Sequence, residues 1–472
     1  MNWALVVTLL YLAIVLSVGF AAARRSKGGT QEFFLAGRQL PWIFLLPLLA
    51  AEYISGGTTV GVAEKLHKTG IFGLTYYLAS PFGLLMLAYG FAKFFQQIKK
   101  TTVGETIKLL FGEKTRFVVV LTLISLYPFT IMTSALALAT VVGPVLGLPY
   151  LSAVWVCSAF IVCLAIMGLR GQAWMNSIHF ATILVCFIPL GIGAVANVGG
   201  MNNLLSSLPP EHLNLFSEGF SKAAAWMGSA VMIKLIALSA ITAMFAAKSE
   251  KDAKIGAIGT GVFLVVFVTL PALIGLAAYV VDPDLESKQA LWMMCERLGG
   301  WATILASVGV MAAIISTTPA SLLSLGTLAT RDLFLLVKPN AEDKSQLLFC
   351  RLAIVVFAVV GTLIALNMTK SLTILDLGRK STGIRTIITI PMLISILWRR
   401  IHPEAAFWSL LLGIGTGIIW LFLGSPLNLE PMWPGMAVGM VVLAITSLKY
   451  RPSPFKGAEG LDIATGKELK EA

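Results

Sequence analysis

The chain has 472 residues, of which 57% are hydrophobic and only 12% are charged. A soluble globular domain has about 25% charged residues, so the composition excludes that class and indicates a polytopic membrane protein. The formal net charge is +12, but the basic residues follow the orientation of the apolar spans described below. The charge therefore indicates membrane topology and argues against a nucleic-acid partner.

Apolar windows of about 20 residues predict thirteen membrane-spanning helices and hence an all-α fold. Their approximate limits are 2–23, 41–63, 71–95, 117–145, 149–169, 174–199, 222–247, 254–281, 300–330, 347–368, 372–398, 404–424 and 431–449. The eleventh span is the least apolar of the set. Asp376, Arg379, Lys380 and Arg385 interrupt it.

The first apolar run resembles a signal peptide, because three alanines at 21–23 mimic a cleavage site. However, no positive charge precedes this run, and Arg24 and Arg25 follow it at once. This order favours a retained helix with its N-terminus outside the cell. Most other Lys and Arg residues then fall on the cytoplasmic side, which predicts that the C-terminus lies inside.

Two short polar interruptions lie within the apolar helices. Residues 50–59 combine a carboxylate, a Gly-Gly pair and three hydroxyls, and residues 312–318 end in Ser316, Thr317 and Thr318. The hydrocarbon core offers no water, so freed backbone groups and polar side chains need partners inside the protein. A broken helix that faces a hydroxyl-rich helix at the bilayer midplane is typical of an ion-coupled transporter.

Three charged residues, Glu52, Lys234 and Arg385, fall near the centres of the second, seventh and eleventh spans. A lone charge at that depth costs several kcal/mol, so each should face a partner or water. One interpretation is a structural ion pair of Glu52 with Lys234 or with Arg385. The other is that one cation stays unmatched and binds a small organic anion, such as a carboxylate. The residues assigned to the solute site are Glu52, Ser55, Gly56, Gly57, Thr58, Lys234 and Arg385.

No enzyme motif is visible in the sequence. The five cysteines have no CxxC spacing, and neither HExxH nor GxSxG occurs. These patterns predict neither a catalytic centre nor a transition-metal site.

Several segments resemble the sodium:solute symporter family, which includes proline, pantothenate, sugar and sialic-acid carriers. Residues 32–38 (EFFLAGR), followed by Leu-Pro-Trp at 40–42, resemble its signature after the first helix. Residues 50–61 resemble its broken first core helix, and residues 312–317 its eighth. Residues 246–249 and 398–400 match the ends of its sixth and tenth core helices.

The resemblance implies alternating access by a core of two inverted repeats of five helices each. Residues 1–40 would form an extra N-terminal helix and a cytoplasmic loop. The first repeat would span residues 41–200 and the second residues 201–400. Two further helices would occupy residues 401–449, and residues 450–472 would form a polar cytoplasmic tail.

The resemblance also implies a sodium site between the first and eighth core helices. Its ligands would be the backbone carbonyls of Ala51, Ile54 and Ala313 and the hydroxyls of Ser316 and Thr317. Sodium is a hard cation that prefers oxygen ligands, and such a set can replace its hydration shell. Alternatively, the two hydroxyls bond back to carbonyls one turn earlier in their own helix.

The sequence also departs from the family pattern. Pro319 and Ala320 replace the hydroxyls of a second sodium site, so that site should be absent. Asn176 is the nearest counterpart of an Asp that assists sodium in relatives. Leu238 and Thr242 replace amides at the sixth core helix, so the solute side is divergent.

These features predict a plasma-membrane symporter that uses Na⁺ as coupling ion to import a small solute. Its partners would be the solute and the lipid bilayer, and it would be a monomer or a weak homo-oligomer. Two alternatives stay open: proton-coupled symport through Glu52, and a transporter-like solute sensor without turnover.

Overall fold

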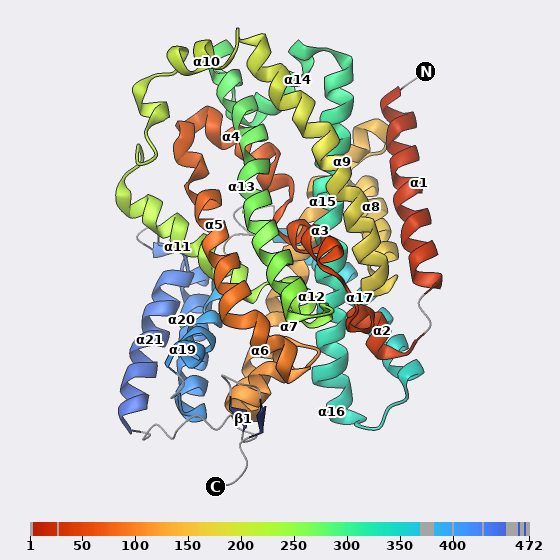
Figure 1. Ribbon diagram of the computed structural model, residues 1–472, viewed down its shortest axis with the longest axis vertical. Helices are drawn as coiled ribbons and strands as arrows, with labels where there is room; N and C mark the ends of the chain where they lie inside the picture. Colours follow the sequence, from red (N-terminus) through yellow and green to blue (C-terminus); the bar gives the residue numbers. More distant parts are fainter. Residues whose placement is uncertain are drawn as a thin grey trace.

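Long α-helices, most of them aligned with one axis, make up nearly all of the described chain (Figure 1). The computed structural model describes residues 3–25, 28–368, 382–398, 401–426, 429–449, 461–462 and 467–468. The two short strands β1 (Leu461–Asp462) and β2 (Lys467–Glu468) pair antiparallel. All other regular structure in this part of the chain is helical, so the predicted all-α polytopic class is confirmed.

The elements follow one another in a regular order. The first part of the chain contains α1 (Trp3–Arg24), α2 (Thr30–Leu35), η1 (Ala36–Arg38), α3 (Trp42–Tyr53), η2 (Gly56–Thr58), α4 (Val60–Thr69), η3 (Gly70–Leu74), α5 (Thr75–Met86), η4 (Leu87–Phe91), α6 (Ala92–Ile98), α7 (Val103–Leu146), α8 (Tyr150–Ala165) and α9 (Gly168–Asn197). The second part contains α10 (Met201–Ser207), η5 (Pro210–Leu213), α11 (Phe220–Ile236), α12 (Leu238–Ala246), α13 (Glu250–Val281), η6 (Ser287–Gln289), α14 (Ala290–Leu298), α15 (Gly300–Ala329), η7 (Thr330–Phe334), α16 (Leu335–Val337), α17 (Asp343–Met368), α19 (Thr389–Trp398), α20 (Pro403–Phe422) and α21 (Met432–Lys449).

Within the described residues, nine helices are long and apolar enough to cross a membrane, or ten if the bent pair α11 and α12 counts as one span. Three shorter apolar helices, Trp42–Tyr53, Tyr150–Ala165 and Thr382–Ile394, coincide with the second, fifth and eleventh predicted spans. The count of thirteen crossings, the outside position of the N-terminus and the repeat boundaries stay predictions. The first part of the eleventh span, with Arg379 and Lys380, lies outside the described residues, as does most of the tail after residue 449.

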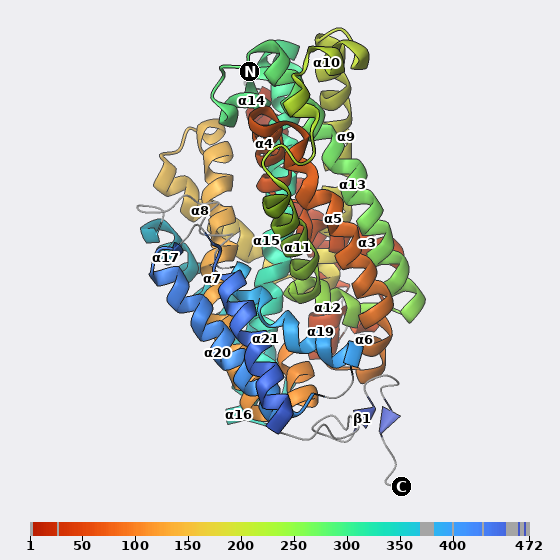
Figure 2. The same cartoon turned by 90° about the vertical axis from the view of Figure 1, so that its left-hand side faces the viewer.

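α15 forms the centre of the bundle. Within its apolar stretch 94% of the residues are buried, against 28% in α1 and in α21. α9, α7, α17 and α3 pack around it, whereas α20 and α21 run side by side at one edge of the molecule (Figure 2). A helix that is apolar on every side belongs in such a fully enclosed position, so the hydroxyls of α15 face protein rather than lipid.

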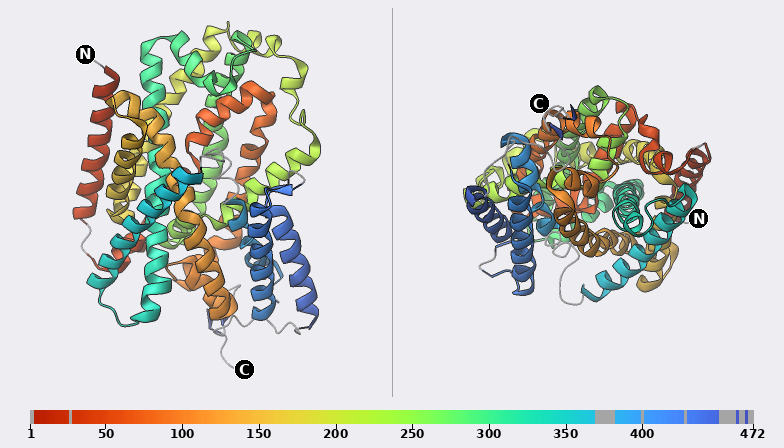
Figure 3. Two further views of the ribbon diagram at one scale, coloured as in Figure 1. Left: turned by 180° about the vertical axis from the view of Figure 1, so that it is seen from behind. Right: turned by 90° about the horizontal axis from the view of Figure 1, so that it is seen from below.

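The two ends of the bundle carry different elements. α4, α10 and α14 gather at the end where α1 begins, and α6 and α16 gather at the end where α21 finishes (Figure 1). α7 runs from the second of these ends along most of the length of the molecule (Figure 3). The segments predicted to be external and cytoplasmic are thus segregated, as the distribution of basic residues requires.

α7 contains a sharp kink at Gly112, where φ is 81°. A residue with a side chain rarely adopts this backbone conformation, so glycine permits the kink. The short first segment of α7 packs against η7 through Asp332, whose side chain is fully buried. Asp332 accepts hydrogen bonds from Arg116 Nε at 2.8 Å and from Thr102 Oγ1 at 2.6 Å. A buried, fully partnered ion pair thus fixes the lower end of α15 to α7.

Candidate ion and solute site

The predicted interruption in the second span is a break in the helix. α3 ends at Tyr53, Ile54 and Ser55 are extended with ψ of 116° and −173°, and α4 begins at Val60. Local hydrogen bonds stabilise the break, because Thr58 Oγ1 accepts from Ser55 N at 2.7 Å and Thr58 N donates to Ser55 O at 3.0 Å. Ala50 O still accepts from Ile54 N at 3.0 Å, whereas Ser55 N donates to Thr58 Oγ1 and leaves Ala51 O available to other groups.

The five predicted sodium ligands come together at this break. Thr317 Oγ1 lies 2.7 Å from Ala51 O, 2.7 Å from Ile54 O and 3.3 Å from Ala313 O. Ser316 Oγ lies 2.9 Å from Ala313 O. Both hydroxyls thus reach a carbonyl of their own helix, as the alternative interpretation expected, but Thr317 also bridges to α3. One hydroxyl proton cannot satisfy three carbonyls at once, whereas a cation at their centre can.

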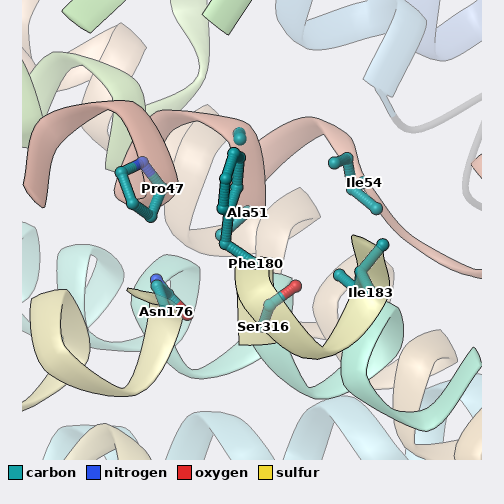
Figure 4. A pocket seen from close by; sticks show the side chains of 8 residues that line it. Pro47, Ala51, Ile54, Asn176, Phe180, Ile183 and Ser316 are labelled. Atoms are coloured by element: carbon teal, nitrogen blue, oxygen red, sulfur yellow. The ribbon is translucent and has the colours of Figure 1, made fainter. Parts of the chain in front are cut away.

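A small pocket opens beside these oxygens (Figure 4). Its volume is about 10 Å³, counted as the space open to the centre of a water molecule, which is close to the minimum for one water. Ala51, Ile54 and Ser316 line it together with Asn176 of α9. Asn176 is 1% exposed, and neither its Oδ1 nor its Nδ2 has a partner among the described residues. A buried amide without a protein partner is unusual, and a water or an ion in the adjoining pocket would satisfy it.

A second break lies in the seventh predicted span. The span predicted over residues 222–247 consists of two helices, because α11 and α12 meet at 44° and Ala237 is extended with ψ of 122°. Neither Gly nor Pro marks this break, and the only local signals are the polar Lys234 and Ser239 in an apolar run. Tyr53 Oη donates to Lys234 O at 3.2 Å. The two broken helices therefore touch at their breaks.

Glu52, at the end of α3, is bound by serines. Its Oε2 accepts a hydrogen bond from Ser321 Oγ at 2.9 Å and another from Ser239 Oγ. Ser321 lies on α15, one turn after Thr317, and sequence reasoning missed it although the spacing of four places both on one helix face. Hydrogen bonds of this kind, from hydroxyls to a carboxylate, are stronger than those between neutral groups.

Lys234 is 3% exposed and packs against aromatic rings. Its Nζ lies 3.9 Å from the ring centroid of Tyr53 and 5.6 Å from that of Tyr76. Among the residues that the structure describes, Lys234 forms no ion pair with a carboxylate within 4.0 Å, so the Glu52–Lys234 pair is not formed as a direct contact. These cation–π contacts stabilise a buried ammonium group.

Arg385 enters the same region from the helix that begins at Thr382. It is 7% exposed, its Cζ lies 3.9 Å from the ring centroid of Tyr127, and its Nη2 donates to Thr382 Oγ1 at 2.6 Å. The charges of Arg385 and Lys234 both act on Glu52. The structure therefore brings the three predicted charges into one region around the two helix breaks.

The remaining predicted solute residues have local roles. Ser55 and Thr58 form the hydrogen bonds that stabilise the break, Gly57 O accepts from Tyr77 Oη at 3.1 Å, and Gly56 packs against Ile314 of α15. These side chains and carbonyls already form contacts within the protein, so their main role is to hold the backbone of the break in its conformation. Of the predicted solute residues, Lys234 and Arg385 are the two with basic side chains.

Comparisons with known proteins agree with this geometry. The profile of the Sodium:solute symporter family matches residues 33–413. The sodium/glucose cotransporter of Vibrio parahaemolyticus is 24% identical over 485 residues, which cover 93% of this chain and 89% of that protein. The high-affinity proline transporter PutP of Bacillus subtilis (strain 168) is 23% identical over 473 residues, which cover 93% of this chain and 97% of that protein.

A solved structure has the same fold. The substrate-bound outward-open state of a Na⁺-coupled sialic acid symporter superposes with a TM-score of 0.80 over 96% of this chain and 98% of that chain, at 17% identity. The predictions of a transporter rather than an enzyme, of sodium as coupling ion and of a multi-pass plasma-membrane protein are confirmed. The chain belongs to the sodium:solute symporter family.

Proposed function

We propose that this protein couples the inward movement of sodium to the uptake of a small organic anion that carries a carboxylate. The observation that carries the choice of an anion is Lys234, a buried ammonium group beside the breaks of both discontinuous helices. Substrates of inverted-repeat transporters bind at such breaks. A buried cation there favours a ligand of opposite charge.

Glu52 strengthens this argument because its hydrogen bonds come from serines. If Glu52 neutralised Lys234 by direct contact, the ammonium group would have little to offer a solute. Instead, Oε2 of Glu52 accepts from Ser239 and Ser321, and Lys234 Nζ lies over Tyr53. Of the three predicted charged residues, Lys234 and Arg385 are basic and Glu52 is acidic, and both basic residues act on Glu52. A monovalent carboxylate would balance this excess.

For sodium, we propose the carbonyls of Ala51, Ile54 and Ala313 and the hydroxyls of Ser316 and Thr317 as ligands. Their convergence on Thr317 Oγ1 supports this set. Asn176, with an unpartnered oxygen in the adjoining pocket, is the additional ligand that we propose. Each of these proposed ligands is a neutral oxygen. Neutral ligands bind sodium weakly enough for the ion to be released again.

The two helix breaks also support the proposed inverted repeat. One break, at residues 54–59, lies in the first helix of residues 41–200, and the other, at Ala237, lies in the first helix of residues 201–400. Equivalent positions in two repeats of opposite orientation would place both breaks near the membrane midplane.

Thermal stability of the purified protein tests the proposal. We expect Na⁺, but not K⁺ at equal ionic strength, to raise the melting temperature, because a ligand that binds only the folded state stabilises it. In the presence of Na⁺, acetate, pyruvate, lactate, succinate and benzoate are compared with uncharged amides of the same size. A further rise with at least one carboxylate and none with its amide is the expected result.

Three results would count against the proposal. Stabilisation by neutral sugars or by zwitterionic amino acids, with no response to any carboxylate, would exclude the anion site. In proteoliposomes, uptake driven by a pH gradient without sodium would favour proton coupling through Glu52. Binding of sodium and solute without any uptake would favour the solute sensor.

A further inference from the structure

Residues 51–54, at the end of α3, contact both the proposed ion site and the proposed solute site. The carbonyls of Ala51 and Ile54 meet Thr317, whereas the side chains of Glu52 and Tyr53 meet α12, α15 and Lys234. Four consecutive residues therefore belong to two sites. Because these residues form one helical turn, a movement of the carbonyls of Ala51 and Ile54 also moves the side chains of Glu52 and Tyr53.

Glu52 forms the connection between three helices. It belongs to α3, its Oε2 accepts from Ser321 of α15, and the same oxygen accepts from Ser239 of α12. Ser239 lies two residues after the break at Ala237. A charge-assisted hydrogen bond is about twice as strong as a neutral one, so the position of this carboxylate determines how α12 lies against α3.

From this arrangement, and on the basis of the proposed sodium site, we propose that Glu52 is a positioning residue that transmits sodium binding to the solute site. Sodium bound by Ala51 O and Ile54 O fixes the end of α3 against Thr317. Glu52 then holds Ser239 and Ser321, and Tyr53 holds the Lys234 carbonyl. The break between α11 and α12, with the Lys234 ammonium group, becomes ordered for the anion. In this assignment Glu52 does not touch the solute.

The inference can be tested with sodium alone, by hydrogen–deuterium exchange measured in NaCl and in KCl. Exchange reports local opening of each segment separately. In the wild-type protein, we expect Na⁺ to slow exchange in two segments, residues 50–60 and residues 230–246. In Ser239→Ala, we expect Na⁺ to slow exchange at residues 50–60 as it does in the wild-type protein. At residues 230–246, the factor by which Na⁺ slows exchange should fall about tenfold, which corresponds to about 1.4 kcal/mol.

Ser321→Ala provides a second variant, and we expect it to reduce the sodium response of residues 230–246 in the same direction. Thr327→Ala is the matched control, because Thr327 is a buried hydroxyl on α15 that donates to Leu323 O of its own helix, at 2.9 Å. This control should retain the sodium response of both segments.

The possible failures are distinguishable. If Ser239→Ala and Ser321→Ala both keep the full sodium response at residues 230–246, the role of Glu52 in transmission is overturned. If residues 50–60 of the wild-type protein do not respond to Na⁺ at all, the proposed ion site itself fails and this inference fails with it.

Discussion

Thr317→Ala removes the hydroxyl that the two sides of the ion site share. Thr317 Oγ1 lies 2.7 Å from both Ala51 O and Ile54 O and 3.3 Å from Ala313 O, so no other side chain in the proposed set touches as many ligands. The alanine variant takes one oxygen away from sodium and leaves the α3 carbonyls without their link to α15. We therefore expect sodium binding to weaken more than folding does.

The magnitude follows from the single oxygen ligand that the substitution removes. A hydrogen bond or ligand bond to a charged group contributes about 1.5–3 kcal/mol. At about 1.4 kcal/mol for each factor of ten, removal of one such ligand should raise the sodium Kd between about tenfold and a hundredfold. Thr317→Ser keeps the oxygen and should restore most of the affinity.

Sodium titration of the melting temperature, at constant ionic strength with KCl, measures this change. Thr318→Ala is the matched control, since its buried hydroxyl bonds to Ile314 O of its own helix, at 3.3 Å. We expect the control to keep the wild-type sodium Kd within about twofold, because the Thr318 hydroxyl is no ligand in the proposed set. An unchanged sodium Kd in Thr317→Ala would refute the ligand set, and an equal weakening in Thr318→Ala would show that the effect is structural.

Four further substitutions test the solute side, the pocket and the Arg116–Asp332 ion pair. Lys234→Met should abolish stabilisation by carboxylates while the response to Na⁺ alone changes by less than about twofold, because every sodium ligand stays in place; a retained carboxylate response would contradict the anion site. Asn176→Leu fills the pocket with an apolar group and should raise the sodium Kd about tenfold, by removal of one ligand; an unchanged Kd in the same sodium titration would remove Asn176 from the set. Arg116→Ala leaves the buried Asp332 carboxylate without its cation and should lower stability by about 3–5 kcal/mol, measured by chemical unfolding. Gly104→Ala should act on the same ion pair, since an added Cβ would lie 2.4 Å from Asp332; a change below about 0.5 kcal/mol in both variants would exclude a stabilising role for this pair.

Sequence reasoning predicted the broken helix and the hydroxyl-rich helix beside it because their signals are local. Gly-Gly, a carboxylate and clustered hydroxyls inside apolar helices are anomalies that can be recognised without any knowledge of packing. The spacing of residues 312–317 and the signature at residues 32–38 then supplied the family, whose profile matches residues 33–413. The break after Tyr53 lies where these signals place it.

The solute side was predicted only in part because its contacts join distant segments. Lys234 and Arg385 stood out as buried charges, but their aromatic neighbours Tyr53 and Tyr127 are 181 residues or more away from them in the chain. The break at Ala237 has no glycine or proline, so neither composition nor periodicity marks it. An extended residue of this kind is fixed by packing between distant segments, which a local sequence window does not show.

The sequence by itself determined the membrane class, the helical fold and the place of the helix break near residue 54, because hydropathy, helix breakers and hydroxyl spacing act within one or two turns. Only the tertiary structure decided which partner each buried charge takes. It assigned Glu52 to two serines rather than to a cation, and it placed Lys234 over Tyr53. Side chains from several helices compete for each charge, and packing alone settles that competition.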